Sequence, residues 1–299
     1  MAELIRPRVF VFGLGYSAVA AAGLLHGQAD IAGTTRDPSR SAALRSAGID
    51  AMTFDGTGRT AAVDAALAQA THVIVSVPPG EAGDPVLALY GEDIANARDL
   101  RWIGYLSSLA VYGNYGGAWV SEDTTPHPKT ERAVRRHRAE LKWRRLGVQH
   151  DIPVAILRIA GIYGPGRNAF VALREGRAHR IAKPGQVFNR IHIDDIAAAI
   201  ASAIRANHGG VLNLADNLPS PPQDVVTYAA GLMDVAPPPE IPFEKAELSP
   251  MARSFYADNK RADNRRLQAL LGRPLAFPSY REGLQALWKG GDWGAESAV

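Results

Sequence analysis

The stretch Val9-Phe10-Val11-Phe12-Gly13-Leu14-Gly15-Tyr16-Ser17-Ala18 begins as an apolar strand and continues into an alanine-rich segment. Gly13 permits a tight turn after the strand, and Gly15 lets a ligand approach the backbone closely. Ala18 is small enough for the following helix to pack on the strand, and the start of that helix offers N–H groups to a pyrophosphate. The stretch predicts a dinucleotide site that uses Gly13, Gly15, Tyr16, Ser17 and Ala18; a purely structural turn is the alternative.

The same strand–helix pattern continues along the chain. Short apolar runs alternate with helical segments, which is typical of a parallel sheet whose two faces are covered by helices. We therefore expect an α/β, doubly wound Rossmann fold. The predicted strands are 8–12, 30–34, 50–54, 72–77, 101–106, 153–158 and 211–214, and the predicted helices between them include 17–26, 61–70 and 86–98.

The regular alternation weakens after about residue 165, where glycine and proline become frequent. This change predicts a smaller C-terminal lobe that holds the substrate, with helices at 259–271 and 280–289. The predicted organisation is a dinucleotide-binding Rossmann part at 1–165, a lobe segment at 166–190, a return to the sheet at 191–218 and the lobe proper at 219–299.

Composition narrows the class of protein. Of 299 residues, 46% are hydrophobic and 21% are charged, which excludes a disordered chain. The net charge of +3 is too small for a dedicated nucleic-acid binder, and the absence of cysteine excludes disulfides, thiolate catalysis and cysteine-type zinc sites. We expect no metal, no nucleic-acid partner and no membrane span, and we expect a cytoplasmic protein. A signal peptide over residues 6–25 is disfavoured because Gly13 and Gly15 interrupt its apolar run.

The end of the second strand indicates which dinucleotide is bound. Thr34-Thr35-Arg36, with Arg40 one turn later, stands where a carboxylate would bind the ribose of NAD. A guanidinium and hydroxyl groups suit a 2′-phosphate, so the sequence predicts NADP, with NAD less favoured. Arg36 could instead be a solvated charge, and Asp55 could bind the adenine amino group or belong to a turn. The predicted cofactor-binding set also includes Thr35, Ser76, Val77, Pro78 and Arg136.

Three later motifs carry a family resemblance. They are Tyr105-Leu-Ser-Ser-Leu-Ala-Val-Tyr-Gly113, Leu157-Arg-Ile-Ala-Gly-Ile-Tyr-Gly-Pro-Gly166 and Arg190-Ile-His-Ile-Asp-Asp-Ile-Ala197. Together with the N-terminal glycine motif, they resemble the epimerase/dehydratase-like branch of the short-chain dehydrogenase/reductase superfamily over residues 8–215. The resemblance implies an NAD(P)-dependent oxidoreductase or epimerase that binds a small molecule between its two lobes.

The resemblance also implies roles for individual residues. Ser108 stands where the family has the hydroxyl that binds the substrate oxygen, although it could be a strand-end hydroxyl satisfied by the backbone. Asp84 lies near the expected position of an active-site Asn, but it is equally a turn residue before Pro85. Tyr163 belongs to a motif whose tyrosine packs or lines the cleft. The candidate catalytic residues are therefore Ser108, Asp84 and Tyr163.

One departure from the family pattern concerns the proton donor. The family has a Tyr followed four residues later by a Lys, and these positions fall at Arg132 and Arg136. An arginine keeps its proton at any relevant pH and cannot act as the general acid. The loss of such a group costs on the order of 10²–10⁴ in rate. The sequence thus resembles an atypical member: an enzyme without the usual pair, or alternatively a non-catalytic protein that senses NADP(H) and regulates a partner.

A second departure concerns the substrate. Nucleotide-sugar epimerases have an Asn where this chain has Gly161 and a diphosphate-binding Arg where it has Phe188, so a nucleotide sugar is disfavoured. Positive charge near the cleft still favours a small anionic molecule, and the residues expected to supply it are Arg158, Arg167, Lys183 and Arg190.

Seven basic residues lie between Arg132 and Arg145, but they scatter around the predicted helix instead of forming one stripe. The apolar strip that we expect to face inward is formed by Val134, His137, Leu141 and Val148. Trp143 and Leu146 would then face outward, where they could form a homodimer contact.

Overall fold

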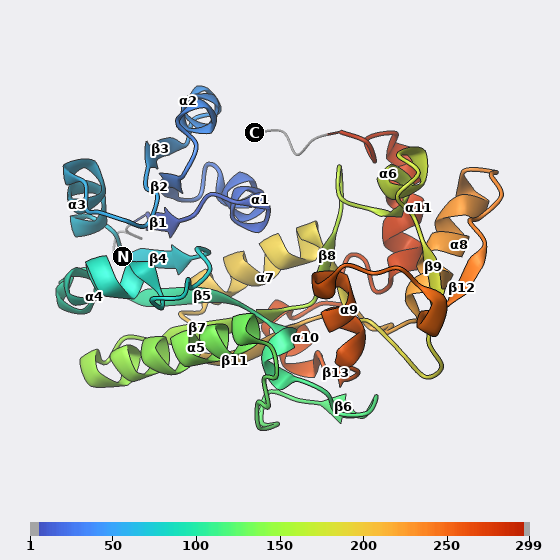
Figure 1. Cartoon of the computed structure of the whole chain (residues 1–299). Helices are drawn as coiled ribbons and strands as arrows, with labels where there is room; N and C mark the ends of the chain where they lie inside the picture. Colours follow the sequence, from blue (N-terminus) through green and yellow to red (C-terminus); the bar gives the residue numbers. More distant parts are fainter. Residues whose placement is uncertain (1–5, 296–299) are drawn as a thin grey trace.

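The computed structural model describes residues 6–295, so residues 1–5 and 296–299 of the predicted first and last segments lie outside the described residues. A seven-stranded parallel sheet in the order β11-β7-β5-β4-β1-β2-β3 forms its centre (Figure 1). These strands are β1 (Arg8–Phe12), β2 (Asp30–Thr35), β3 (Asp50–Thr53), β4 (His72–Val75), β5 (Trp102–Ser108), β7 (Val154–Ile159) and β11 (Gly210–Leu214). The predicted doubly wound α/β Rossmann fold is confirmed.

Helices cover both faces of this sheet. On one face lie α1 (Tyr16–Leu25), α2 (Pro38–Ser46), α7 (Ile193–Arg205) and α10 (Arg265–Leu271). On the other lie α3 (Ala61–Ala68), α4 (Pro85–Asn96) and α5 (Glu131–His150). The alternation of strand side chains explains the two layers, because Val9 and Val11 pack in the first cluster and Phe10 and Phe12 in the second. Among residues 6–295, no helix is both long and apolar enough to span a bilayer.

The strand order places the site. From β1, the chain first builds outward through β2 and β3 and then returns to β4 on the opposite side of β1. Loops that leave β1 and β4 therefore diverge, which opens a crevice at the carboxyl ends of these neighbouring strands.

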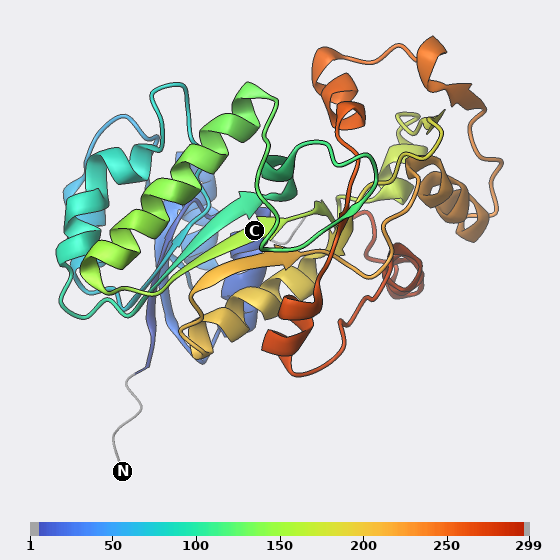
Figure 2. The ribbon, with the colours of Figure 1, turned by 90° about the horizontal axis from the view of Figure 1, so that it is seen from below.

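A second group of elements forms the lobe on one side of this crevice (Figure 2). It comprises α6 (Ala169–Arg174), β9 (Arg180–Ala182), α8 (Pro222–Leu232), β12 (Glu240–Pro242), the short helix η2 (Phe243–Lys245), α9 (Pro250–Ala257) and α11 (Tyr280–Gly290). Its own apolar cluster includes Phe170, Ala229, Leu284 and Leu287. The lobe is thus stabilised by a core separate from the two layers of the sheet.

Short strand pairs connect the two parts. β8 (Gly161–Tyr163) pairs with β10 (Arg190–His192), and β6 (Trp119–Val120), which follows the short helix η1 (Leu109–Tyr112), pairs with β13 (Arg261–Ala262). The second pairing corrects the helix predicted at 259–271. Residues 261–262 are extended because they hydrogen-bond to the β6 segment, and the helix begins only at Arg265.

The predicted faces of the basic helix are wrong. Leu141 is 50% exposed and Val148 is 85% exposed, whereas Trp143 is fully buried. The indole of Trp143 donates a hydrogen bond to Asp84 at 2.9 Å, and Gly147 lets α5 approach Val154 closely. These two contacts turn the Trp143 side of the helix toward the sheet. Trp143 therefore cannot form the predicted homodimer contact, and the homodimer itself stays a prediction.

An ion pair is buried beneath α5. Glu140 and Arg158 are 1% and 3% exposed, and Arg158 donates to both carboxylate oxygens at 3.1 and 2.7 Å. The hydroxyl of Ser107 donates to the same carboxylate at 2.5 Å. Burial acts to raise the pKa of Glu140, but hydrogen bonds from His137, Arg158 and Ser107 together with the Arg158 charge hold this pKa below its ordinary value. Glu140 therefore ties α5 to both β5 and β7.

The substitution Glu140→Gln is expected to destabilise the protein by about 3–5 kcal/mol, because it leaves the Arg158 charge buried without a partner. The measurement is the free energy of unfolding in urea at neutral pH. The difference from wild type should shrink as the pH falls below the ordinary pKa of Glu, about 4.3, and toward the lower pKa of the native carboxylate. Glu175→Gln, which breaks an exposed pair with Arg177, is the control and should cost under about 1 kcal/mol. Equal effects of the two substitutions would contradict this role of Glu140.

Candidate functional site

The turn between β1 and α1 has the geometry that a phosphate cradle requires. Gly13 has φ +92°, and a Cβ built there would lie 3.1 Å from Cγ2 of Val77. The Gly13 N–H donates to the hydroxyl of Thr34 at 3.0 Å, and the Leu14 N–H donates to the Thr34 carbonyl at 2.6 Å. The neighbouring strand therefore fixes the turn and aims the start of α1 into the crevice.

The first turn of α1 is open toward the crevice. Gly15 precedes the helix without a capping side chain, and the Val19 N–H donates to the Gly15 carbonyl at 2.9 Å. A Cβ at Gly15 would have its nearest neighbour 4.0 Å away, so this approach is clear. Ala18 is fully buried beneath it, as close helix–strand packing requires. The helix start thus offers backbone N–H groups to an anion.

Tyr16 has a further contact that links the two parts of the molecule. Its hydroxyl donates to the Pro165 carbonyl at 2.9 Å, and burial raises its pKa to about 12. The phenol is therefore neutral and holds the loop after β8 against α1.

The end of β2 presents two arginines. Arg36 is exposed directly after Thr35, and Arg40 is half-buried in the first turns of α2. The Nε of Arg40 is buried and has no hydrogen-bond partner among the described residues. The adjacent Asp37 carboxylate caps α2 by accepting from the Ser39 N–H at 2.9 Å. Asp37 is therefore already hydrogen-bonded within its own turn, while Arg36 and Arg40 are available to a ligand.

Two predicted carboxylates have structural partners. Asp84 caps α4 by accepting from the N–H groups of Val86 and Leu87 at 2.9 and 3.1 Å, and it also accepts from Trp143. Burial raises the pKa of Asp84. It is absent from the lining of the large cleft, so the structure gives no support to its role as a catalytic candidate, which stays a prediction. The Asp55 carboxylate accepts a hydrogen bond from the Thr57 N–H in an exposed turn. This agrees with the alternative prediction, in which Asp55 is a turn residue.

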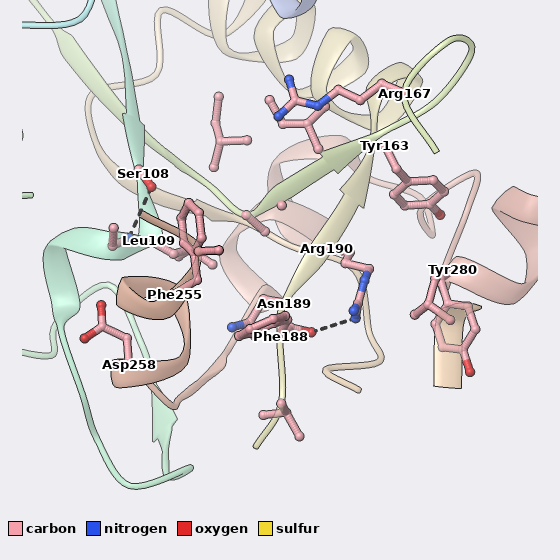
Figure 3. Close-up of a pocket in the computed structure, with 18 of the residues that line it drawn as sticks. Ser108, Leu109, Tyr163, Arg167, Phe188, Asn189, Arg190, Phe255, Asp258 and Tyr280 are labelled. Carbon is pink, nitrogen blue, oxygen red and sulfur yellow. Dashed lines mark hydrogen bonds between the residues drawn. The ribbon is translucent and has the colours of Figure 1, made fainter. Parts of the chain in front are cut away.

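A cleft of about 890 Å³ runs from the start of α1 to the lobe (Figure 3). It brings together predicted residues from distant parts of the chain, namely Ser17, Ser76, Ser108, Arg136 and Tyr163. Most of the remaining wall is apolar or aromatic. Those lining residues include Leu109, Ile181, Val187, Phe188, Val225, Leu248, Phe255, Tyr256, Tyr280 and Leu284.

Ser108 and Arg136 lie on the sheet side of this cleft. The Ser108 hydroxyl oxygen accepts from the Ala110 N–H at 3.2 Å, which leaves its proton available to a substrate oxygen. Arg136 donates to the Leu106 carbonyl at 2.7 Å and is thereby held at the cleft wall. One turn earlier, the Arg132 guanidinium lies 5.3 Å from the ring centroid of Phe255 in the lobe.

Tyr163 forms part of the opposite wall. Its hydroxyl donates to the Ser279 carbonyl at 3.1 Å, and burial raises its pKa far above the ordinary value. This phenol holds its proton in a fixed hydrogen bond, so the structure supports a lining role and gives no support to acid catalysis by Tyr163.

The positive charge of the cleft differs from the predicted set. Two of the predicted basic residues do not line the cleft: Arg158 is paired with Glu140 beneath α5, and Lys183 donates a hydrogen bond to the Tyr256 carbonyl. The other two, Arg167 and Arg190, do line it. Phe255, Asp258 and Lys260 also line the cleft, and no sequence motif predicts a role for them. Their only sequence signal was a C-terminal segment that resembles the family's lobe, and only the tertiary fold brings them into the same cleft as Ser108.

Comparison with known proteins agrees with this arrangement. The model of the NAD dependent epimerase/dehydratase family matches residues 17–215. A conserved protein of unknown function from Silicibacter pomeroyi DSS has a structure with TM-score 0.85 and 42% identity, over 95% of this chain and 99% of that one. UDP-glucuronic acid 4-epimerase from Bacillus cereus, solved with NAD, shares the fold at TM-score 0.72 and 17% identity, over 94% and 97% of the two chains.

A curated relative is the 3-diazoavenalumate denitrifying reductase of a Streptomyces species, which is 28% identical over 158 residues. The match covers 49% of this chain and 51% of the relative, so the chain spans about half the length of the curated relatives it matches.

The two glycines of the cradle should respond differently to alanine. Gly13→Ala forces a Cβ into a left-handed backbone against Val77 and should destabilise the fold by at least about 1–2 kcal/mol. A Cβ at Gly15 would lie 4.0 Å from the Ser76 hydroxyl, an ordinary van der Waals distance, so Gly15→Ala should leave stability unchanged. It should nevertheless weaken NAD(P)H binding by at least about tenfold, because its methyl group occupies the phosphate approach. Urea unfolding and fluorescence titration measure the two effects; unaltered dinucleotide affinity in Gly15→Ala would refute the cradle.

Proposed function

The chain belongs to the NAD-dependent epimerase/dehydratase family, and from this premise we propose that it is an NADP(H)-dependent oxidoreductase that reduces a small anionic carbonyl compound. The observation that carries the proposal is the continuous cleft. It joins the open start of α1 to Ser108 and to the cationic residues of the lobe.

The residues present fit NADP, the dinucleotide that carries an additional 2′-phosphate. The clear approach at Gly15 accommodates a pyrophosphate at the start of α1. The unpartnered Nε of Arg40, with the exposed Arg36 beside it, suits the 2′-phosphate of NADP. Asp37, which could otherwise accept from a ribose hydroxyl, is engaged with Ser39. These features favour NADP over NAD.

Reduction suits the side chains of this cleft better than epimerisation does. When bound, the reduced nicotinamide supplies a hydride, which forms a C–H bond as the carbonyl electron pair moves to oxygen. Ser108 donates a hydrogen bond to that oxygen, and the positive charge of Arg136 at the same wall stabilises the developing negative charge. Solvent in the open cleft supplies the proton.

Arg132 and Arg136 occupy the positions of the family's Tyr and Lys in the sequence pattern, and we propose that no phenol transfers the proton. An epimerase must remove a proton as well as return it, whereas a reductase needs only a proton that solvent can supply. The partial match to a reductase supports this choice.

The cofactor preference has a direct test. Arg36→Ala and Arg40→Ala should each weaken NADPH binding by about 10- to 100-fold, because each removes a charge-assisted contact to phosphate. The affinity for NADH, measured by the same fluorescence titration, is the internal control and should change less than about twofold. Equal loss for the two nucleotides, or an initial preference for NADH, would refute the assignment of NADP.

Turnover distinguishes the enzyme from the alternative NADP(H) sensor. With small carbonyl-containing acids as substrates, NADPH oxidation at 340 nm should be measurable, and Ser108→Ala should lower kcat by about 10²-fold with NADPH affinity retained. Ser107→Ala tests the neighbouring hydroxyl, which binds Glu140. It should reduce stability more than kcat. Tight NADPH binding without turnover of any such acid would support the sensor.

A further inference from the structure

Arg190 is unusual among the cationic residues of the cleft. It lies in β10 at the lobe end, and three hydrogen bonds hold its guanidinium to the Phe188 carbonyl and to the carbonyl and hydroxyl of Ser220. All three use Nη1, at 2.9–3.2 Å. Among the described residues, Nε and Nη2 of Arg190 have no hydrogen-bond partner. Neither atom is completely buried. These two donors are therefore fixed in direction and available to the cleft.

The charge of Arg190 lacks an ion-pair partner. No carboxylate of residues 6–295 forms an ion pair with it within 4.0 Å. Burial lowers its pKa, which reflects the cost of keeping this charge away from water. A half-buried cation of this kind is stabilised when an anion supplies the missing charge.

Among the acids, Asp216 has the largest electrostatic effect on Arg190, but it neutralises the Arg190 charge poorly. One of its carboxylate oxygens accepts from the Leu218 N–H at 3.0 Å, and the other is buried with no partner in the described chain. Burial raises the pKa of Asp216 to about 7, so a large fraction of this carboxyl is uncharged at neutral pH. The positive potential at Arg190 therefore remains.

Several aromatic side chains lie around Arg190 in the cleft. The Tyr280 ring centroid lies 6.0 Å from the guanidinium, and Phe188 packs edge-on against Tyr256 at 5.1 Å. Phe255 reaches in from α9 on the side of Ser108 and Leu109, between them and Phe188 (Figure 3). A ligand at this place meets one fixed pair of donors at one end and aromatic surface along its length.

We propose that the substrate is a small carboxylate with an aromatic or other apolar body. Its carboxylate binds Nε and Nη2 of Arg190 as a bidentate pair, and its body lies against Phe188 and Phe255. This inference rests on the proposed function and specifies its substrate class. A nucleotide sugar is disfavoured, because Phe188 stands where nucleotide-sugar epimerases have a diphosphate-binding Arg.

The test uses protein saturated with NADP⁺ and calorimetric titration of 3-phenylpropanoate. The uncharged 3-phenylpropanamide should bind at least about tenfold more weakly, because it lacks the charge that Arg190 requires. Acetate should also bind at least about tenfold more weakly, because it lacks the apolar body. Equal binding of acid and amide, binding of acetate as tight as that of the aryl acid, or no binding of 3-phenylpropanoate would each overturn the inference.

Variants locate the site. Arg190→Gln should weaken 3-phenylpropanoate binding by at least about 30-fold, and Arg190→Lys should restore part of the loss. Arg180→Gln is the matched control, because Arg180 lies in the same lobe, outside the cleft lining, and pairs with Glu240. It should bind like wild type. Loss of binding in Arg167→Gln together with wild-type binding in Arg190→Gln would place the anion elsewhere and refute the proposal.

NADPH affinity and melting temperature, measured for every variant, separate the two proposals. Failure of wild-type protein to bind NADPH would overturn the proposed function. Normal NADPH binding without discrimination between acid and amide would overturn only the carboxylate site. If Arg190→Gln fails to fold, the ligand comparison on wild-type protein still decides the outcome.

Discussion

The buried pair of Glu140 and Arg158 fixes the relation between α5 and the two central strands on which the cleft is built. Ser107 and Arg158 reach the same carboxylate from β5 and β7. Successive side chains of a strand point to opposite faces, so Ser107 directed to Glu140 leaves Ser108 directed to the cleft. Arg136, one helical turn before Glu140, is brought to the cleft wall by the same constraint.

The cleft itself depends on a few polar contacts between the sheet and the lobe. Tyr16 holds the loop after β8, and Tyr163 holds the segment before α11. The Asp195 carboxylate accepts from the N–H groups of residues 276 and 277 at 2.8 and 3.0 Å, which fixes the same segment to α7. Because each contact satisfies a buried or half-buried polar group, separation of the two parts would leave these groups without their partners. The cleft is thus bounded by fixed walls on both sides.

The arginines of this chain differ in whether their charge is neutralised inside the protein or left available to a ligand. Arg158 is neutralised beneath α5, and Arg136 is held on a backbone carbonyl at the cleft wall. Arg190 is held by one nitrogen only, so its other donors remain directed at a ligand. A planar guanidinium permits this division because its donors point in different fixed directions.

The sequence by itself determined the parallel sheet, the glycine turn at Gly13 and Gly15 and the family, because strand periodicity and turn chemistry are local properties of the chain. It did not determine which face of α5 is buried, since Trp143 turns inward to a partner 59 residues earlier, at Asp84. It also could not distinguish the paired Arg158 from the unpaired Arg190, or place Phe255 in the same cleft as Ser108. Those assignments depend on contacts between residues distant in the chain, and only the tertiary structure decides whether a charge is paired, exposed or left for a ligand.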